Sequence, residues 1–254
     1  MTATFPDLDG ASVFLTGGGS GIGRAVAEGF LRQGARLAFV GRSDASAAVE
    51  DMEAATGNRP LFLRCDVTDI AALRAAMDRA AAAHGPITRL VNNAANDERH
   101  PTLAVDEPFW DWSVAINQKA YFFACQHAVP GMRAAGGGRI VNFSSISYMM
   151  GAAGYAIYAA SNAAITSFTR SLAREFGADG IRVNAIAPGW VLTGRQLERW
   201  ADPESLAAHL DKQCLPEHLA PADLVEPVLF LASEAARMMT GQVMVVDGGV
   251  VTTG

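Results

Sequence analysis

A glycine-rich run near the N-terminus has residue types and spacing suited to binding an anion. Residues 16–23 read Thr-Gly-Gly-Gly-Ser-Gly-Ile-Gly, directly after an apolar segment and directly before residues with helical periodicity. Free backbone N–H groups at a helix N-terminus and the positive end of the helix dipole attract phosphate. Glycine lets the backbone approach a pyrophosphate because it has no Cβ atom. Glycine clusters also make ordinary turns, but this strand-turn-helix context favours dinucleotide binding.

Strand-like and helical segments alternate along the chain. Ile22, Val26 and Phe30 share one face of a predicted helix, and Gly34 follows where that helix would end. Apolar runs typical of strands are residues 11–15, 36–40, 61–65, 90–92, 139–143, 182–187 and 242–246. This alternation predicts an α/β fold, a Rossmann-like doubly wound parallel sheet of about seven strands with helices on both faces. No linker or repeat divides the chain, so we expect residues 1–254 to form a single domain.

Polar residues follow several of the predicted strands at the point where each strand ends. They are Asp66, the run Asn92-Asn93-Ala94-Ala95, the pair Ser144-Ser145, and Pro188-Gly189. Carboxyl ends of parallel strands meet at one edge of the sheet, where ligands of such folds bind. Polar turn residues follow strands in many proteins, but clusters at one common edge favour a binding site.

Composition argues against several other functions. The chain has 20 Lys and Arg against 26 Asp and Glu, a formal net charge of −6, and no basic stripe, so we expect no nucleic-acid partner. Its five histidines and three cysteines lack metal-ligand spacing, which predicts no metal site. Cys65, Cys125 and Cys214 are interpreted as reduced thiols. The sequence shows no leader pattern and no bilayer-spanning run, so we expect no membrane partner and a cytoplasmic location.

The chain resembles the short-chain dehydrogenase/reductase family over nearly its whole length. The resemblance rests on residues 16–23, residues 92–95, Asn117, Ser145 thirteen residues before Tyr158, and Pro188-Gly189 with Thr193. It implies a Rossmann-like fold and hydride transfer between a nicotinamide cofactor and a small-molecule alcohol or carbonyl. Residues 240–249 resemble the family's last strand, which implies a homotetramer.

The resemblance also implies roles for a candidate catalytic set, Asn117, Ser145, Tyr158 and Asn162. Oxidation of an alcohol needs a general base within hydrogen-bonding reach of the reacting oxygen, and Tyr158 is the candidate. Ser145 would hold the same oxygen and stabilise its developing charge. Asn117 would anchor a chain of water molecules leading to solvent.

Residues around the predicted strand ends are the candidate cofactor-binding set. They are Gly17, Gly19, Ser20, Gly21, Ile22, Gly23, Arg42, Asp66, Val67, Asn93, Ala94, Ala95, Tyr158, Asn162, Pro188, Gly189, Val191 and Thr193. For Asp66, a helix N-cap is the competing role. An acidic residue ending the second strand is the usual sign of NAD, whereas this chain has Gly41 and Arg42 there. Because Arg42 can pair with a 2′-phosphate, NADP is favoured over NAD, and Asp44 nearby would weaken that preference.

Asn162 departs from the family pattern. The family motif is Tyr-x-x-x-Lys, whereas residues 158–162 read Tyr-Ala-Ala-Ser-Asn, so Asn162 stands one helical turn from Tyr158 where an ammonium is expected. A nearby cation lowers the pKa of a tyrosine by about 1 to 3 units, and a neutral amide does so less. Three explanations stay open: a slow natural enzyme, compensation by another cation such as Arg195, or a protein that binds cofactor without rapid chemistry.

Two further segments resemble the sugar-oxidising branch of the family, the xylose-type aldose 1-dehydrogenases. They are the polar tail 96–100 and a substrate loop at about residues 190–220. This resemblance implies an aldose that is oxidised at C1 to a lactone. The candidate substrate residues are Asn96, His100, Ser147, Trp190, Arg195 and Gln196. Other secondary alcohols and ketones stay open as substrates, as do a turn-shaping role for His100 and a packing role for Trp190.

Overall fold

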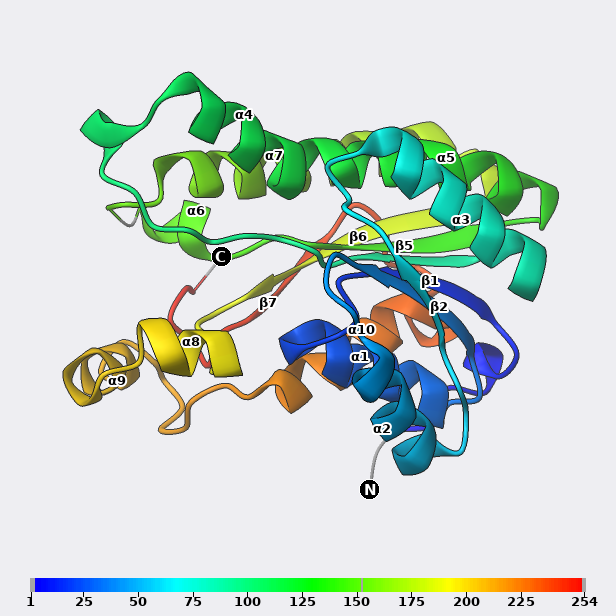
Figure 1. The fold of residues 1–254 in the computed structure, drawn as a ribbon, viewed down its shortest axis with the longest axis horizontal. Coiled ribbons are helices and arrows are strands. Elements are labelled where there is room, and N and C mark those ends of the chain that lie inside the picture. The colour runs from blue at the N-terminus through cyan, green and yellow to red at the C-terminus, as the bar shows by residue number, and fades with distance from the viewer. Residues whose placement is uncertain (1–2, 152, 253–254) are drawn as a thin grey trace.

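The computed structural model describes residues 3–151 and 153–252 and has the α/β architecture expected from the sequence (Figure 1). Seven parallel strands form one sheet in the order β3-β2-β1-β4-β5-β6-β7. The strands are β1 Ser12–Thr16, β2 Arg36–Gly41, β3 Leu61–Arg64, β4 Arg89–Asn92, β5 Gly138–Phe143, β6 Ile181–Pro188 and β7 Val243–Val246. Every predicted strand is present, with its ends within one residue of the predicted ones.

Helices cover both faces of this sheet, as expected for a doubly wound fold (Figure 1). Helices α3, α4, α5 and α7 cover one face, and α1, α2 and α10 cover the other. Their bounds are α1 Gly21–Arg32, α2 Ser46–Thr56, α3 Ile70–His84, α4 Glu107–Val114, α5 Ala120–Ala134, α6 Ser147–Met150, α7 Ala156–Phe176, α8 Gly194–Arg199, α9 Pro203–Leu210 and α10 Val225–Ala232. The chain order reverses between the neighbouring strands β1 and β4, which creates the crevice where such folds bind ligands.

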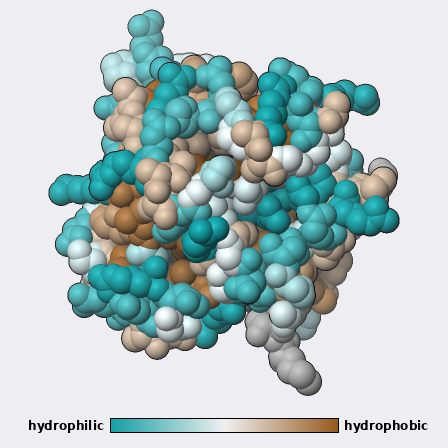
Figure 2. Space-filling model, turned by 90° about the vertical axis from the view of Figure 1, so that its right-hand side faces the viewer, coloured by the Kyte–Doolittle hydropathy of each residue, from teal (hydrophilic) through white to brown (hydrophobic). Residues whose placement is uncertain are grey.

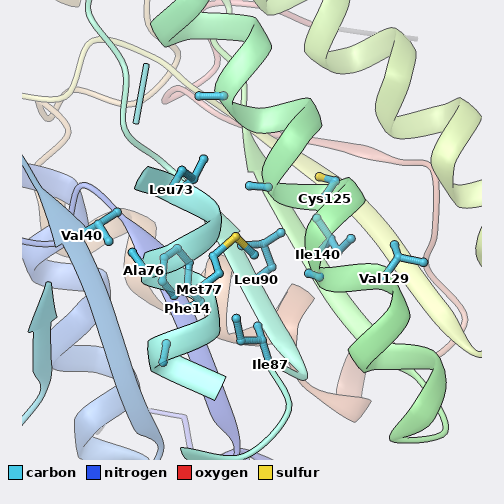
Figure 3. Packing of buried hydrophobic residues seen from close by; sticks show 14 of the residues in the cluster. Phe14, Val40, Leu73, Ala76, Met77, Ile87, Leu90, Cys125, Val129 and Ile140 are labelled. Carbon is cyan, nitrogen blue, oxygen red and sulfur yellow. The ribbon is translucent and has the colours of Figure 1, made fainter. Parts of the chain in front are cut away.

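The core is divided by the sheet because successive side chains of a strand point to opposite faces. In β1, Phe14 packs toward α3, while Val13 and Leu15 pack toward α1. Figure 3 shows the hydrophobic cluster on the α3 side of the sheet, in which Leu90 of β4 lies beside Met77 of α3. Strands buried on both faces are apolar throughout, which is why the sequence showed them as continuous apolar runs.

Three arginines lie in register at the amino ends of β4, β5 and β6. Arg89 pairs with Arg139 in the sheet, and Arg139 pairs with Arg182. Arg182 donates to the carbonyl of Ser233 at 2.6 Å, and Arg89 forms an ion pair with Asp7 at 3.2 Å. This end of the molecule lies opposite α8 and α9. It faces the viewer in Figure 2, where its surface is mostly hydrophilic with apolar side chains between the polar ones.

The glycine-rich turn between β1 and α1 is held against the segment that follows β4. Gly17 and Gly21 have φ angles of +77° and +54°, which glycine adopts readily. A Cβ atom at Gly23 would overlap the carbonyl oxygen of Gly17, so only glycine allows α1 to begin this close to the turn. Asn93 Nδ2 donates to the carbonyls of Thr16 and Gly17, both at 3.0 Å, and fixes this geometry.

Two glycine-to-alanine substitutions separate this packing constraint from the general effect of removing a glycine. Gly23→Ala should lower the free energy of unfolding by about 1–3 kcal/mol, because the new methyl group displaces α1 from the turn. Gly194→Ala, at the first residue of α8, should change it by less than about 0.5 kcal/mol, since no atom lies within 4 Å of the added Cβ. Urea unfolding without added ligand measures both. Equal changes would contradict the packing account.

Candidate active site

A cleft of about 450 Å³ opens at the carboxyl ends of β4, β5 and β6. Many of the residues singled out in the sequence line it, although they come from six separate segments of the chain. They are Ile22, Asn93, Ala95, Asn117, Ser145, Ser147, Tyr158, Asn162, Pro188, Gly189, Trp190, Val191, Thr193, Arg195 and Gln196. The remaining predicted cofactor residues lie beside the cleft, in the glycine-rich turn and at the ends of the neighbouring strands β2, β3 and β4.

Asn96 and His100, which were also predicted as substrate contacts, do not line this cleft in the structure. The His100 ring is only 7% exposed and packs against Phe109 with ring centroids 4.9 Å apart. Asn96 Oδ1 accepts hydrogen bonds from the backbone N–H of Glu98 at 2.9 Å and from Arg195 at 3.2 Å. Both side chains therefore shape the loop after β4, as the turn-shaping alternative for His100 proposed.

Tyr158 and Asn162 lie one turn apart on α7 and line the cleft together. Asn162 is buried, and its Nδ2 donates to the backbone carbonyl of Tyr158 at 2.9 Å. Burial and, after it, the carboxylate of Asp97 raise the pKa of Tyr158 to about 12, although hydrogen bonding with Asn162 and Ser145 opposes the rise. The Tyr158 hydroxyl is therefore protonated at neutral pH in the protein alone.

Asn117 lies in a π-helical segment, Ala115–Lys119, that interrupts the continuous helix from α4 to α5. Such π turns are rare and occur mostly at functional sites. Its amide pairs with the backbone of Asn96, accepting from the N–H at 2.8 Å and donating to the carbonyl at 2.9 Å. Asn117 thereby fixes the loop after β4 at the side of the cleft.

The N-terminus of α1 fits the pyrophosphate of a dinucleotide. The side chain of Ser20, the N-cap residue, accepts no hydrogen bond from the first turn, so the backbone N–H groups there stay free to bind an anion. A Cβ atom at Gly19 would meet Ala45 at 3.4 Å and Phe39 at 3.9 Å, both ordinary van der Waals distances, so the turn is not crowded there. Backbone donors and the helix dipole thus converge on one open position.

The end of β2 carries positive charge. Arg42 is exposed and has no acidic partner among the residues that the structure describes. Arg64 of β3 lies beside it, because its Nε donates to the carbonyl of Arg42 at 2.9 Å. The Asp44 carboxylate does not pair with Arg42. It accepts hydrogen bonds from the backbone N–H and the hydroxyl of Ser46, which lower the pKa of Asp44. Sequence reasoning missed Arg64, since only the strand register, Gly41 opposite Arg64, brings it there.

Asp66 and Val67 follow β3 next to this basic edge, and the competing N-cap role for Asp66 is wrong. Asp66 Oδ1 accepts from the backbone and the hydroxyl of Thr68, at 3.0 and 2.8 Å. The N-cap of α3 is Asp69, whose side chain accepts from Ala72. Asp66 therefore stays at the strand end, in a local turn.

The loop after β4 is joined to α8 by a polar network that sequence analysis did not predict. Glu98 forms ion pairs with Arg195 at 3.4 Å and Arg199 at 3.0 Å. Gln196 donates to Asp97 at 2.6 Å and accepts from the indole of Trp190 at 2.8 Å. The only sequence signal was the polarity of residues 96–100, which did not show what they contact.

Arg195 does not bring an unshared positive charge to Tyr158. Its guanidinium lies 3.6 Å from Asp97 and 3.4 Å from Glu98, so two carboxylates share its charge. The groups that lower the pKa of Tyr158 are the side chains of Asn162 and Ser145, both of them neutral. Of the three explanations left open by the sequence, compensation by Arg195 is therefore not supported.

The chain matches a family model described as "Enoyl-(Acyl carrier protein) reductase" over residues 17–251. It is 47% identical over 251 residues to the probable galactose dehydrogenase GalD of Rhizobium meliloti (strain 1021), with 98% of each chain covered. It is 40% identical over 249 residues to D-xylose 1-dehydrogenase of Caulobacter vibrioides (strain NA1000 / CB15N), again with 98% of each covered.

Among solved structures it resembles 3-oxoacyl (acyl-carrier-protein) reductase from Agrobacterium tumefaciens C58 with NADP bound. The TM-score is 0.89 and the identity 31%, over 95% of each chain. The sequence matches, the order of strands in the sheet and the cleft lined by Ser145 and Tyr158 all point to the same family. The chain therefore belongs to the short-chain dehydrogenase/reductase family of oxidoreductases.

Proposed function

We propose that the protein is an NAD(P)-dependent dehydrogenase that oxidises an aldose at C1 to a lactone. One observation carries the proposal: the cleft that holds Ser145 and Tyr158 is walled by polar side chains and by Trp190. A sugar needs hydrogen-bonding groups for its hydroxyls and an aromatic face for its C–H surface. The names of the two relatives, a galactose and a xylose dehydrogenase, support the same substrate class.

The chain's own residues supply the proton chemistry of this reaction. Bound nicotinamide would accept the hydride from C1. In its ionised form Tyr158 takes the proton of the C1 hydroxyl as the carbonyl forms, and Ser145 holds the same oxygen. The backbone N–H of Ser147 donates to Ser145 Oγ at 3.1 Å, which leaves the serine hydroxyl hydrogen free to point at the substrate. Asn117 positions the loop after β4 and leads the proton toward water.

The cofactor set proposed from the sequence divides among three places. Residues 17–23 would hold the pyrophosphate at the start of α1, and Arg42 with Arg64 would bind a 2′-phosphate, so we propose NADP in preference to NAD. Asp66 and Val67 would contact the adenine. The residues after β4 and β6, together with Tyr158 and Asn162, would contact the nicotinamide ribose.

Residues 1–254 are proposed to form one domain, with residues 190–220 as the substrate loop. Helices α8 and α9 belong to this loop, and α8 carries Arg195 and Gln196 to the cleft.

A homotetramer is proposed because β7 is an edge strand whose four residues are all partly exposed. Within residues 3–151 and 153–252 no helix is long and apolar enough to cross a membrane. Free thiols at Cys65, Cys125 and Cys214 support the cytoplasm as the location.

A second candidate is a family member that binds cofactor with little turnover. It is carried by Asn162, which brings no charge to Tyr158, and by the high pKa of that tyrosine. Oxidation of another secondary alcohol, or reduction of a ketone, is the alternative within the enzyme class.

A substrate panel tests the proposed reaction. D-Galactose and D-xylose should reduce NADP⁺ in the presence of the protein, and the product should be a lactone, because the cleft offers polar contacts to the remaining hydroxyls. Nicotinamide absorbance follows the rate, and NMR identifies the product. Turnover of simple ketones or monohydric alcohols without turnover of any aldose would refute the proposal.

The pH dependence of kcat tests the role of Asn162. A base with a pKa of about 12 is almost wholly protonated at pH 7, so kcat should rise about tenfold per pH unit from pH 7 to 10. Asn162→Lys should lower the pKa of Tyr158 and raise kcat at pH 7 by about 10- to 1000-fold. Asn162→Gln, which stays neutral, and Tyr158→Phe, which removes the base, are the controls. A fast wild type with a neutral optimum that the lysine impairs would contradict this account.

Cofactor preference tests Arg42. Arg42→Ala should weaken NADP binding by about 10- to 100-fold through loss of a charge-assisted hydrogen bond, and should leave NAD binding nearly unchanged. Fluorescence titration of both reduced cofactors into wild type and variant measures this. Tighter binding of NAD than of NADP in the wild type would disprove the assignment.

A further inference from the structure

Asp97 supplies the only carboxylate among the described residues that line the cleft. The charged side chains beside it in the wall are Arg99, Arg195 and Lys212. A carboxylate is an acceptor only, with about four lone-pair positions, whereas hydroxyl groups of a substrate are donors as well as acceptors. Asp97 is thus the strongest hydrogen-bond acceptor in the wall.

The two oxygens of Asp97 differ in their contacts. Oδ2 accepts from Gln196 Nε2 at 2.6 Å. Oδ1 lies 3.6 Å from the Arg195 guanidinium, close enough for an ion pair and too far for a hydrogen bond. No donor among the described residues is within hydrogen-bonding distance of Oδ1, although the side chain is only 24% exposed. This oxygen keeps its acceptor positions free while its partner oxygen is fixed.

Asp97 is not needed to hold the loop after β4 in place. Glu98 already joins this loop to α8 through Arg195 and Arg199. Asn117 fixes the same loop from the other side through the backbone of Asn96. A purely structural role therefore does not account for Asp97 Oδ1, which accepts no hydrogen bond from the described residues.

Asp97 also lies close enough to the reacting position to influence it. Its charge raises the pKa of Tyr158, an effect second only to burial. Asp97, Ser145 and Tyr158 line the same cleft, so a substrate whose reacting oxygen rests on Tyr158 and Ser145 shares that cleft with the Asp97 carboxylate.

We propose that Asp97 determines substrate specificity by accepting, through its free oxygen, a hydrogen bond from a hydroxyl group next to the reacting carbon. The inference rests on the proposed aldose dehydrogenase function and deepens it. It explains how the cleft selects polyhydroxylated substrates: a monohydric alcohol brings no donor to Asp97 and leaves a charged acceptor unpaired in the closed cleft.

The proposal predicts two opposite effects of one substitution. Asp97→Asn keeps the shape of the side chain and removes its charge. Affinity for a sugar should fall by about 10- to 100-fold, because hydrogen bonds to charged groups are the strong ones. The alkaline rise of kcat should move to lower pH, because the negative charge that opposes ionisation of Tyr158 is gone. Loss of structure alone would not produce this pair of changes.

The matched control is Glu98→Gln, which removes the same charge from the neighbouring residue outside the cleft wall. Calorimetry with the protein and NADP⁺ measures binding of D-galactose and D-xylose, and steady-state kinetics measures KM and kcat for these sugars and for cyclohexanol. We expect Asp97→Asn to lose sugar affinity as above and to lose no kcat/KM for cyclohexanol, which should instead rise as the pKa of Tyr158 falls. Glu98→Gln should change sugar affinity by less than about threefold.

The possible failures can be told apart. If the wild type binds and oxidises aldoses and Asp97→Asn binds them equally well, the role of Asp97 is wrong and the proposed function stands. Equal losses in Asp97→Asn and Glu98→Gln, or an equal loss toward cyclohexanol, would also overturn the role of Asp97 alone. If the wild type neither binds nor oxidises any aldose, the proposed function fails, and the role of Asp97 fails with it.

Discussion

The contact between the glycine-rich turn and the loop after β4 sets the geometry of the whole site. Thr16 Oγ1 accepts from the backbone N–H groups of Asn93 and Ala94, at 2.9 and 3.0 Å, while Asn93 returns two hydrogen bonds to the turn. These bonds cross from β1 to β4, the point where the strand order reverses. They place the N-terminus of α1 beside the wall that carries Asp97, so cofactor and substrate positions depend on the same bonds.

Around this frame the electrostatics of the cleft are unusual for a site that must remove a proton. Tyr158 is partly buried in the cleft wall, has a neutral amide one turn away, and has its pKa raised by the carboxylate of Asp97. All the arginine charge that α8 brings close is already shared with Asp97 and Glu98. The carboxylate proposed to recognise a polyhydroxylated ligand also raises the pKa of Tyr158 and so makes proton removal more costly at neutral pH. On this proposal, substrate recognition and the cost of proton removal have a common origin.

Sequence reasoning reached the fold and named residues that line one cleft because both depend on local patterns. Apolar runs located every strand within one residue, and short motifs located Ser145 and Tyr158 in the cleft. It failed where the partner lies far away in the chain. Asn96 was assigned to substrate, whereas its side chain contacts Arg195, 99 residues further on. Arg64 reaches Arg42 only through the register of two strands. No spacing rule encodes such contacts.

The central claim is that hydride leaves C1 of an aldose in this cleft. The most direct measurement is to incubate the protein with NADP⁺ and with D-galactose and D-xylose deuterated at C1, and to follow the deuterium by NMR. The account predicts deuterium at the reduced nicotinamide ring and a lactone without deuterium. Deuterium that stays in an oxidised sugar product would contradict it, because another carbon would then have lost the hydride.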